Sequence, residues 1–319
     1  MTSLLERLAR WTRAVPRALR RIGLLRPLAP DQWLDGDFEH QHRELGYKLF
    51  IPARGAGRPR PLLLMLHGCS QDPEDFATGT RMNHVAAELG FLVLYPAQTQ
   101  KANAGKCWNW FLPQHQQAAR GEPALLAALT QAVMQEHGAD PARVCVAGLS
   151  AGGSMADILG RTHPELFAAV GVHSGLPSGA ARDLLSALGA MKNGPGKASG
   201  GEVLRPTIVF HGDADETVHP RNGEQVAADA VAGLLAGGDH PPAHEMRGRS
   251  EGGRAFTRRT HADARGAVMV EHWLLHGGGH AWAGGSADGS FTDPTGPDAS
   301  AEMLRFFLSH PMIERTRVR

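Results

Sequence analysis

Little in this sequence points to a bound metal, a cofactor or a membrane span. Only three of its 319 residues are cysteine, which is too few for a fold built on disulfides. It has no Cys-x-x-Cys pair with metal-site spacing and no Gly-x-x-x-x-Gly-Lys phosphate loop, so we expect neither a metal nor a cofactor. No apolar run approaches the ~20 residues that cross a bilayer. A net charge of +1 argues against nucleic acid as the main partner.

The remaining composition is that of an ordinary globular domain. Hydrophobic residues make up 42% and charged residues 20% of a chain that is long enough for one substantial core. The expected strands are 47–51, 62–66, 91–95, 144–147, 168–172, 207–210 and 268–275, and the expected helices are 81–89, 123–136, 151–162, 180–191, 223–235 and 300–308. This alternation predicts an α/β fold with a mainly parallel sheet and helices on both faces.

Residues 143–153 contain the most informative motif. They predict a buried strand, a sharp turn and a helix, and the turn carries Gly-Leu-Ser-Ala-Gly at positions 148–152. In this setting a G-x-S-x-G pentapeptide holds its serine in a strained conformation with the hydroxyl clear of the backbone. A side chain at either glycine would collide with the neighbouring strand or helix. Ser150 is therefore the candidate nucleophile.

A serine hydroxyl needs a base and an acid that orients the base. In α/β-hydrolases these follow in the order serine, acid, histidine. Asp213 directly follows Gly212 and can simply cap the turn after strand 207–210. Asp215 lies one step further out, where a carboxylate can reach a histidine on the next loop. We therefore expect Asp215 to be the acid, with Asp213 as the alternative.

The candidate histidine is His280, one of 17 histidines in the chain. It follows the expected strand 268–275 in a loop with glycines on both sides, which suits the accurate placement of one imidazole close to other backbone. Four other histidines lie near the same elements and are expected to be surface, capping or packing residues: His211, His219, His272 and His276.

Two backbone N–H groups are expected to form the oxyanion hole. One belongs to Ala151, the residue after the nucleophile, and the other to the loop that follows strand 62–66. That loop opens with His67 and Gly68, so we assign its donor to Cys69. Ser70 is the alternative.

Tryptophans near the loops are the expected substrate surface. Trp108 and Trp110, in the segment 107–111, suit an apolar polyester or an aromatic acyl group. Trp282, in the histidine loop, can add a wall, and Ser70 is also expected to contact substrate. The alternative is that the two tryptophans of one loop simply pin it to the core.

Seven short motifs carry a family resemblance. They are HGCSQ at 67–71, GTRMN at 79–83, YPAQ at 95–98, CWNWF at 107–111, GLSAGG at 148–153, HSG at 173–175 and GHAW at 279–282. With them the chain resembles the poly(3-hydroxybutyrate) (PHB) depolymerase-family esterases over roughly residues 47–308. These are α/β-hydrolases related to feruloyl and acetylxylan esterases. The resemblance implies ester hydrolysis through Ser150, Asp215 and His280, and it leaves the substrate open.

Three functions are compatible with these features. The leading one is hydrolysis of short-chain poly(3-hydroxyalkanoate), such as PHB, or its oligomers. The second is hydrolysis of feruloyl or acetyl esters of plant polysaccharide. A non-catalytic granule- or surface-binding protein is an alternative of another class. The intact serine, acid and histidine argue against that alternative, because a binding role does not need them.

The first 40 residues are expected to form a basic N-terminal arm ahead of a single catalytic domain, residues 41–319. Residues 1–30 hold seven arginines and one glutamate, and one helical face carries the apolar residues Leu4, Leu8, Trp11 and Val15. Such a helix can pack on the domain or contact a membrane surface or polymer granule. No secretory signal is recognisable, so we expect a cytoplasmic or granule-associated protein.

The three cysteines leave one question open. Cys145, in the strand before the nucleophile, is expected to be a buried apolar filler. Cys69 and Cys107 lie on two loops that should both overhang the site. A bridge between them would fit an oxidising compartment, whereas bridges rarely persist in the cytoplasm.

Two segments interrupt the alternation of strands and helices. Residues 176–203 are expected to hold a helix and then a glycine-rich loop, and residues 237–254 are expected to be a surface excursion. Each is either a partial lid at the border of the site or a plain solvated loop.

Overall fold

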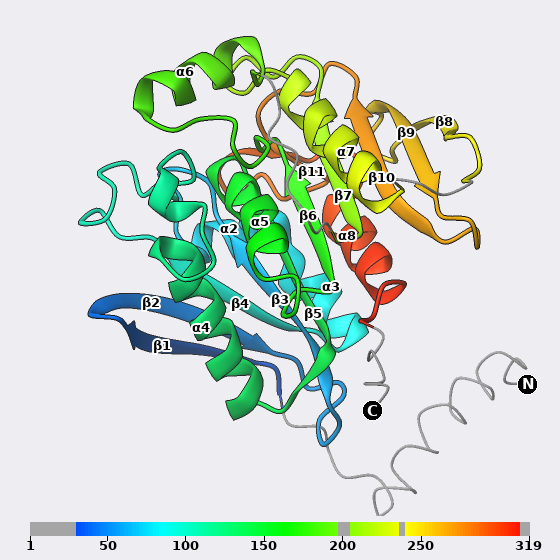
Figure 1. Cartoon of the computed structure of the whole chain (residues 1–319). Helices are drawn as coiled ribbons and strands as arrows, with labels where there is room; N and C mark the ends of the chain where they lie inside the picture. The colour runs from blue at the N-terminus through cyan, green and yellow to red at the C-terminus, as the bar shows by residue number, and fades with distance from the viewer. Residues whose placement is uncertain (1–29, 197–204, 236–239, 313–319) are drawn as a thin grey trace, which may run out of the picture.

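A ten-stranded sheet forms the centre of the fold (Figure 1). The computed structural model describes residues 30–196, 205–235 and 240–312. In spatial order the strands are β1 (Gln32–His40), β2 (Arg43–Ile51), β4 (Leu92–Ala97), β3 (Arg60–Leu66), β5 (Ala139–Leu149), β6 (Ala169–His173), β7 (Thr207–Gly212), β10 (Val268–Leu275), β9 (Ala255–Ala262) and β8 (His244–Arg249). The strands from β4 to β10 run parallel, and an antiparallel pair is added at each edge.

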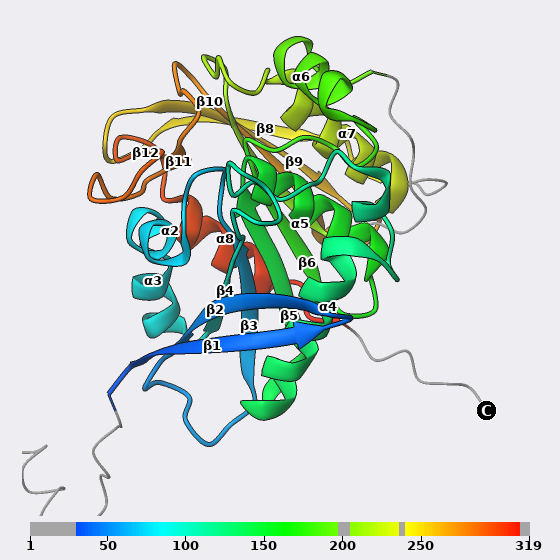
Figure 2. The same ribbon diagram turned by 90° about the vertical axis from the view of Figure 1, so that its left-hand side faces the viewer.

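Helices cover both faces of this sheet (Figures 1 and 2). One layer is α4 (Gly121–Glu136), α5 (Ala151–Thr162) and α7 (Arg221–Leu234), and the other is α2 (Pro73–Thr80), α3 (Met82–Leu89) and α8 (Ala299–Leu308). α6 (Leu184–Asn193) lies beyond the carboxyl ends of the central strands in both views. The remaining described elements are the short helix η1 (Pro113–His115) and the paired strands β11 (Trp282–Ala283) and β12 (Thr292–Asp293). None of the helices in the described ranges is long and apolar enough to cross a membrane.

Side-chain alternation along the parallel strands builds two cores, one on each face. In β3, Leu62, Leu64 and Leu66 join the cluster that contains the buried faces of α4, α5 and α7. Leu63 and Met65 join the cluster that contains those of α2, α3 and α8. All five side chains are fully buried, as a central parallel strand requires. The predicted α/β fold is confirmed.

The chain enters the sheet earlier than we predicted. Residues 32–40, which we assigned to the N-terminal arm, form β1, and β1 pairs with β2 along its whole length. An exposed edge strand needs few apolar residues, and QWLDGDFEH has no buried position, so hydrophobic periodicity could not reveal it. The predicted helical face from Leu4 to Val15 lies outside the described residues.

A second correction concerns residues 237–254, which we predicted to be a surface excursion. Their described part contains β8, an edge strand that pairs with β9. Its sequence, HEMRGR, is charged and lacks an apolar run, which suits an exposed edge. β8 is five strands away from β5 in the sheet, so it does not cover the loop after β5. In the other segment, 176–203, the predicted helix is α6, and residues 197–203 lie outside the described ranges.

The carboxyl ends of β3, β5 and β7 meet at one edge of the sheet. β5 pairs in parallel with β3 on one side and with β6 on the other, and β6 pairs with β7. In open α/β sheets, ligands bind in the loops that follow these strand ends. The same loops carry His67, Ser150 and Asp215.

Candidate active site

Ser150 occupies a tight turn between β5 and α5. Its backbone has φ 56° and ψ −118°, a sparsely populated combination that costs a residue with a side chain ~1–3 kcal/mol. The N–H of Ser150 donates to the carbonyl of His173 at 2.8 Å. A Cβ at Gly148 would lie 2.4 Å from the carbonyl carbon of Gly152, and a Cβ at Gly152 would lie 2.0 Å from the carbonyl oxygen of Leu66. The predicted turn is confirmed, and both glycines are required because backbone approaches them so closely.

Asp215 and His280 contact each other across 65 residues of sequence. Nδ1 of His280 lies 2.8 Å from Oδ2 of Asp215. The other carboxylate oxygen accepts the backbone N–H groups of Thr217 at 2.9 Å and Val218 at 2.8 Å. Because a carboxylate only accepts hydrogen bonds, His280 holds a proton on Nδ1, and its Nε2 is left to act as a base. The structure thus brings together the acid and the histidine predicted from the sequence.

The alternative acid, Asp213, is engaged elsewhere. One of its carboxylate oxygens lies 2.9 Å from Nδ1 of His276, and the other accepts the N–H of Gly277 at 2.6 Å. These contacts brace the beginning of the loop that leads to His280. Asp213 therefore has a structural place in this loop, and Asp215 is the acid in contact with His280.

Asp215 is held in its ionised form although it is buried. Burial by itself raises the pKa of this carboxyl, but hydrogen bonds from His211, His280 and the N–H of Val218 outweigh it and hold the pKa well below its ordinary value. Nε2 of His211 lies 2.8 Å from the carbonyl of Val218 and 3.3 Å from Oδ2 of Asp215. Both partners only accept, so this nitrogen carries a proton. His211 is a second imidazole donor to the acid, a role that no local sequence signal distinguished.

The loop after β3 lies beside the nucleophile. A Cβ at Gly68 would be 3.7 Å from Cβ of Ser150. Among the described residues, none accepts a hydrogen bond from the backbone N–H of Cys69 or of Ala151. The N–H of Ser70, the alternative donor, is already given to a carbonyl of the neighbouring loop at 2.7 Å. The N–H groups of Cys69 and Ala151 are therefore the two that remain available to an oxyanion.

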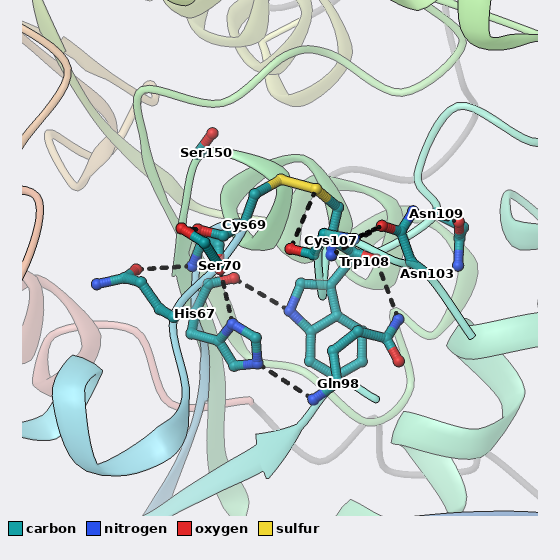
Figure 3. Close-up of a disulfide and its surroundings, with 12 residues drawn as sticks. His67, Cys69, Ser70, Gln98, Asn103, Cys107, Trp108, Asn109 and Ser150 are labelled. Carbon is teal, nitrogen blue, oxygen red and sulfur yellow. Dashed lines mark hydrogen bonds between the residues drawn. A yellow bond between two sulfur atoms is a disulfide. The ribbon is translucent and has the colours of Figure 1, made fainter. Parts of the chain in front are cut away.

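A buried imidazole supports the loop after β3, the candidate oxyanion loop (Figure 3). Nε2 of His67 accepts the N–H of Gln98 at 3.1 Å, so Nδ1 carries the proton and donates to the carbonyl of Gly68 at 2.7 Å. The indole N–H of Trp108 donates to the carbonyl of His67 at 3.1 Å. Burial lowers the pKa of His67 to about 4, so the ring is neutral at pH 7 and keeps this tautomer. These bonds fix the loop that carries the Cys69 N–H.

A disulfide joins Cys69 to Cys107 (Figure 3). The sequence neither predicted nor excluded a bridge between Cys69 and Cys107, and the structure contains it. It ties the oxyanion loop to the loop after β4, at a sequence separation of 38. Cys145 is the free cysteine, and burial raises the pKa of its thiol to about 12. A thiol of that kind is unreactive, which agrees with its predicted place as an apolar filler.

The three tryptophans predicted to contact substrate belong to the core. Trp108 is 0%, Trp110 5% and Trp282 1% exposed. The indole N–H of Trp108 is used by the carbonyl of His67, and that of Trp282 donates to Oγ of Ser300 at 3.1 Å. The prediction was wrong because a large ring that is buried on all sides holds a loop in place and presents no surface to a ligand. The burial of Trp108 and Trp110 agrees with the alternative, that the two tryptophans of one loop pin it to the core.

The exposed aromatic ring near the site is Phe291, which sequence reasoning missed. Its side chain is 46% exposed, and its ring centroid lies 6.5 Å from that of His280. It follows a polar, glycine-containing stretch with no motif or periodicity that singles it out. Ser70 is exposed, and its hydroxyl donates to the carbonyl of Cys69 at 2.6 Å. Contact between Ser70 and substrate stays a prediction.

A cavity near the loops after β4 is separate from the residues of the candidate triad. A cavity of about 620 Å³ lies between the β1–β2 turn, the loops after β4 and the start of α4, and none of the three residues lines it. Within the described ranges, no three His, Cys, Asp or Glu side chains are placed to hold a metal ion. The loops at the carboxyl edge of the sheet do gather an imidazole, a carboxylate, a serine and backbone N–H donors.

Comparison with known proteins places this chain in a family. Residues 45–237, more than half of the chain, match the family described as "Esterase PHB depolymerase". The chain belongs to the PHB depolymerase esterase family. Relatives of this chain carry the names of depolymerases and esterases.

The relatives divide between polyester and carbohydrate substrates. This PHB depolymerase-family esterase is 30% identical over 234 residues to poly(3-hydroxyalkanoate) depolymerase C of Paucimonas lemoignei, covering 69% of this chain and 54% of that protein. It is 28% identical over 197 residues to acetylxylan esterase A of Talaromyces purpureogenus, covering 54% of this chain and 50% of that protein. The chain therefore spans about half the length of these relatives. Its fold is similar to that of an acetyl xylan esterase from Aspergillus awamori, with a TM-score of 0.65 and 18% identity over 88% of this chain and 100% of that chain.

Proposed function

We propose that this esterase hydrolyses short-chain poly(3-hydroxyalkanoate), PHB above all, or its oligomers, through Ser150, His280 and Asp215. The observation that carries the proposal is the 2.8 Å contact between Nδ1 of His280 and Oδ2 of Asp215, in a chain whose Ser150 occupies the strained turn after β5. A serine, an acid and a histidine in this chain order, on these loops, form the triads of α/β-hydrolases.

Ser150 acts as the nucleophile. Its Oγ attacks the carbonyl carbon of the ester while Nε2 of His280 takes the hydroxyl proton. Asp215, held in its ionised form, stabilises the resulting imidazolium and keeps the proton on Nδ1 in place. The N–H groups of Cys69 and Ala151 bind the negative oxygen of the tetrahedral intermediate.

Collapse of this intermediate gives an acyl-enzyme. His280 passes its proton to the leaving oxygen, so the alcohol departs and the acyl group stays on Ser150. A water molecule then gives a proton to His280 and attacks the acyl carbonyl. The second collapse returns the proton to Ser150 and releases the acid. With a hydroxyalkanoate chain, the alcohol and the acid are the two shortened chains.

Two observations favour a polyester. The depolymerase relative is 30% identical over 234 residues. The exposed ring of Phe291, close to His280, offers an apolar contact to an aliphatic ester. The second candidate substrate is an acetyl or feruloyl ester of a carbohydrate, which the acetylxylan esterase relative favours.

Acid release from amorphous PHB granules tests the substrate. We expect wild-type protein to release hydroxybutyrate and its oligomers, and Ser150→Ala to release none above background. Absence of release from wild type, together with cleavage of p-nitrophenyl butyrate, would keep the esterase and reject the polyester. Acetylated xylan and methyl ferulate would then be the next substrates to measure.

Attachment and location are separate proposals. We propose that residues 1–30, which lie outside the described ranges, contact a polymer granule or an anionic membrane surface. Deletion of these residues should lower partitioning onto PHB granules, and unchanged partitioning would reject the proposal. A Cys69–Cys107 disulfide persists best in an oxidising compartment, which counts against the cytoplasmic location predicted from the sequence. The thiol state of both cysteines in intact cells is the corresponding measurement.

A further inference from the structure

His173 has no chemical role in the reaction above, yet it bonds to the backbone of Ser150 and to the loop that carries His280. Its backbone carbonyl, at the end of β6, accepts the N–H of Ser150 at 2.8 Å. Its ring nitrogen Nε2 lies 3.0 Å from the backbone nitrogen of Ala283, three residues after His280. One fully buried residue therefore bonds to the serine turn with its main chain and to the histidine loop with its side chain.

We infer that His173 is a positioning residue that couples the turn carrying Ser150 to the loop carrying His280. This inference rests on the proposed function, because it assigns to His173 the alignment of the proposed nucleophile with the proposed base. His173 does not contact the reacting atoms. Its contribution is to hold the loop of His280 at a fixed position relative to the carboxyl end of β6.

The direction of the hydrogen bonds fixes the state of the ring. The N–H of Ala283 can only donate, so Nε2 of His173 must accept. The ring proton then lies on Nδ1, which is 3.1 Å from the hydroxyl of Ser174. A charged ring would carry a proton on both nitrogens and lose the bond to Ala283. Burial first, and then the nearby His211 and His280, lower the pKa of His173 to about 3, so the ring is neutral at the pH of ester hydrolysis.

Aromatic contacts prevent the ring from turning away. It stacks against Phe210 with centroids 5.7 Å apart and planes 10° apart, and against Trp282 with centroids 5.1 Å and planes 25° apart. Trp282 lies two residues after His280 and is itself buried. His173 thus holds the histidine loop twice, through the face of Trp282 and through the N–H of Ala283.

The acceptor nitrogen, Nε2 of His173, distinguishes a positioning role of this residue from a role in packing alone. A phenylalanine at 173 would keep the stack but leave the N–H of Ala283 buried and unpaired, which costs ~1–3 kcal/mol. The loop can relieve that cost by moving, and a displacement of about 1 Å in catalytic geometry lowers a rate by roughly 10². A glutamine can place its amide oxygen near the position of Nε2, whereas the shorter asparagine cannot.

Four variants test the inference: His173→Phe, His173→Gln, His173→Asn and the control His272→Phe. The control replaces a partly buried histidine of the same sheet, whose Nε2 has no hydrogen-bond partner among the described residues. For each protein we would measure kcat and KM on p-nitrophenyl butyrate and the rate at which a fluorophosphonate labels Ser150. Labelling that has gone to completion gives the number of molecules with a reactive Ser150. The rate is divided by this number, so that kcat refers to folded protein alone. The melting temperature is recorded alongside.

We expect His173→Phe to lower kcat about 10- to 100-fold with KM within about threefold of wild type, and to slow labelling by the same factor. His173→Gln should stay within about fivefold of wild type, while His173→Asn should behave like the phenylalanine variant. His272→Phe should leave kcat per site within about twofold. Should His173→Phe not fold, the ratio of the glutamine to the asparagine variant decides, and a ratio of at least about tenfold is expected.

A purely structural role would give a different pattern. His173→Phe would then melt at a lower temperature but keep the kcat per labelled site of wild type, and glutamine would be no better than asparagine. Either result would overturn the inference. Failure of the proposed nucleophile is distinguishable, because wild-type Ser150 would then not be labelled at all. A substrate other than a polyester would leave the labelling and all four comparisons unchanged.

Discussion

Nδ1 of His280 lies 2.8 Å from Oδ2 of Asp215, and this contact joins the loop after β10 to the loop after β7. The same two loops are joined a second time by His276 and Asp213, at 2.9 Å. The two pairs differ in exposure. The side chains of Asp215 and His280 are 0% and 11% exposed, while those of Asp213 and His276 are each 39% exposed. Water therefore screens the interaction of Asp213 with His276, whereas Asp215 and His280 form an acid–base pair that is shielded from solvent.

Substitution of the two acids should give unequal losses. Asp215→Asn keeps the shape of the side chain but removes the charge that stabilises the imidazolium, so we expect kcat to fall by roughly 10⁴. Asp213→Asn should lower kcat less than about tenfold, because Asp213 only braces the start of the loop. Both values come from p-nitrophenyl butyrate hydrolysis by folded protein. A larger loss for Asp213→Asn would mean that the wrong acid has been assigned.

Removal of the disulfide should affect both stability and turnover. Cys69→Ser combined with Cys107→Ser frees a loop with a sequence separation of 38, which should cost about 3–4 kcal/mol of unfolding free energy. We expect kcat to fall about 3- to 30-fold with little change in KM, because in the proposed mechanism the Cys69 N–H binds the oxyanion of the transition state.

A matched measurement is thiol counting under denaturing conditions. One free thiol, that of Cys145, is expected before reduction and three after it. Three free thiols without reduction would show that the bridge does not form. An unchanged kcat in the double variant would show that the bridge does not help to place the oxyanion loop.

Two glycine substitutions should have opposite effects on stability. A Cβ at Gly152 would lie 2.0 Å from the carbonyl oxygen of Leu66, so Gly152→Ala should destabilise the fold by more than about 3 kcal/mol or prevent its accumulation. Gly189, on α6, has no atom within 4 Å of the corresponding position, so Gly189→Ala should stabilise the protein by about 0.5–1 kcal/mol. Urea unfolding measures both. Equal effects would contradict the packing described for the serine turn.

Buried neutral histidines should make the protein sensitive to acid. Burial lowers the pKa of His67 to about 4 and that of His173 to about 3, against 6.5 in an unfolded chain. As the pH falls below 6.5, the unfolded state therefore binds protons that the native state does not, and the free energy of unfolding decreases. Between pH 7 and pH 5 we expect a loss of about 2 kcal/mol for each of these histidines.

Urea unfolding of wild type and of His173→Gln at both pH values checks this pH dependence. The glutamine variant cannot titrate at this position, so its stability should fall less steeply than that of wild type. Asp215 affects the free energy of unfolding at lower pH. Its depressed pKa contributes stability that is lost only as the pH falls below about 4. Equal slopes for the two proteins would contradict the assignment of a neutral, buried ring.

The interior of the sheet could be predicted well from the sequence, and its edges could not. A strand that is buried on both faces, such as β3, needs a continuous apolar run, and residues 62–66 supply one. α5 begins and ends at the predicted residues, 151 and 162. β1 and β8 lie at exposed edges, where backbone pairing with a neighbour forms the strand and side chains carry little of the signal.

Some residues of the candidate site could likewise be predicted from the sequence, and others could not. Ser150 and its glycines follow from local geometry that a short motif encodes, and Asp215 and His280 follow from chain order. Support from His173 and His211 depends on contacts between elements far apart in the chain, which no local pattern contains. The burial of Trp108 and Trp282 has the same cause, since aromatic residues serve equally as ligand contacts and as anchors until their neighbours are known.

Labelling with a fluorophosphonate, followed by mass spectrometry of the tryptic peptides, tests the central assignment most directly. We expect one label per molecule, located on Ser150, with hydrolysis of p-nitrophenyl butyrate lost in proportion to labelling. Ser150→Ala should take up no label and show no hydrolysis above background. A label on another residue, or hydrolysis that persists in Ser150→Ala, would contradict the assignment of Ser150 as the nucleophile.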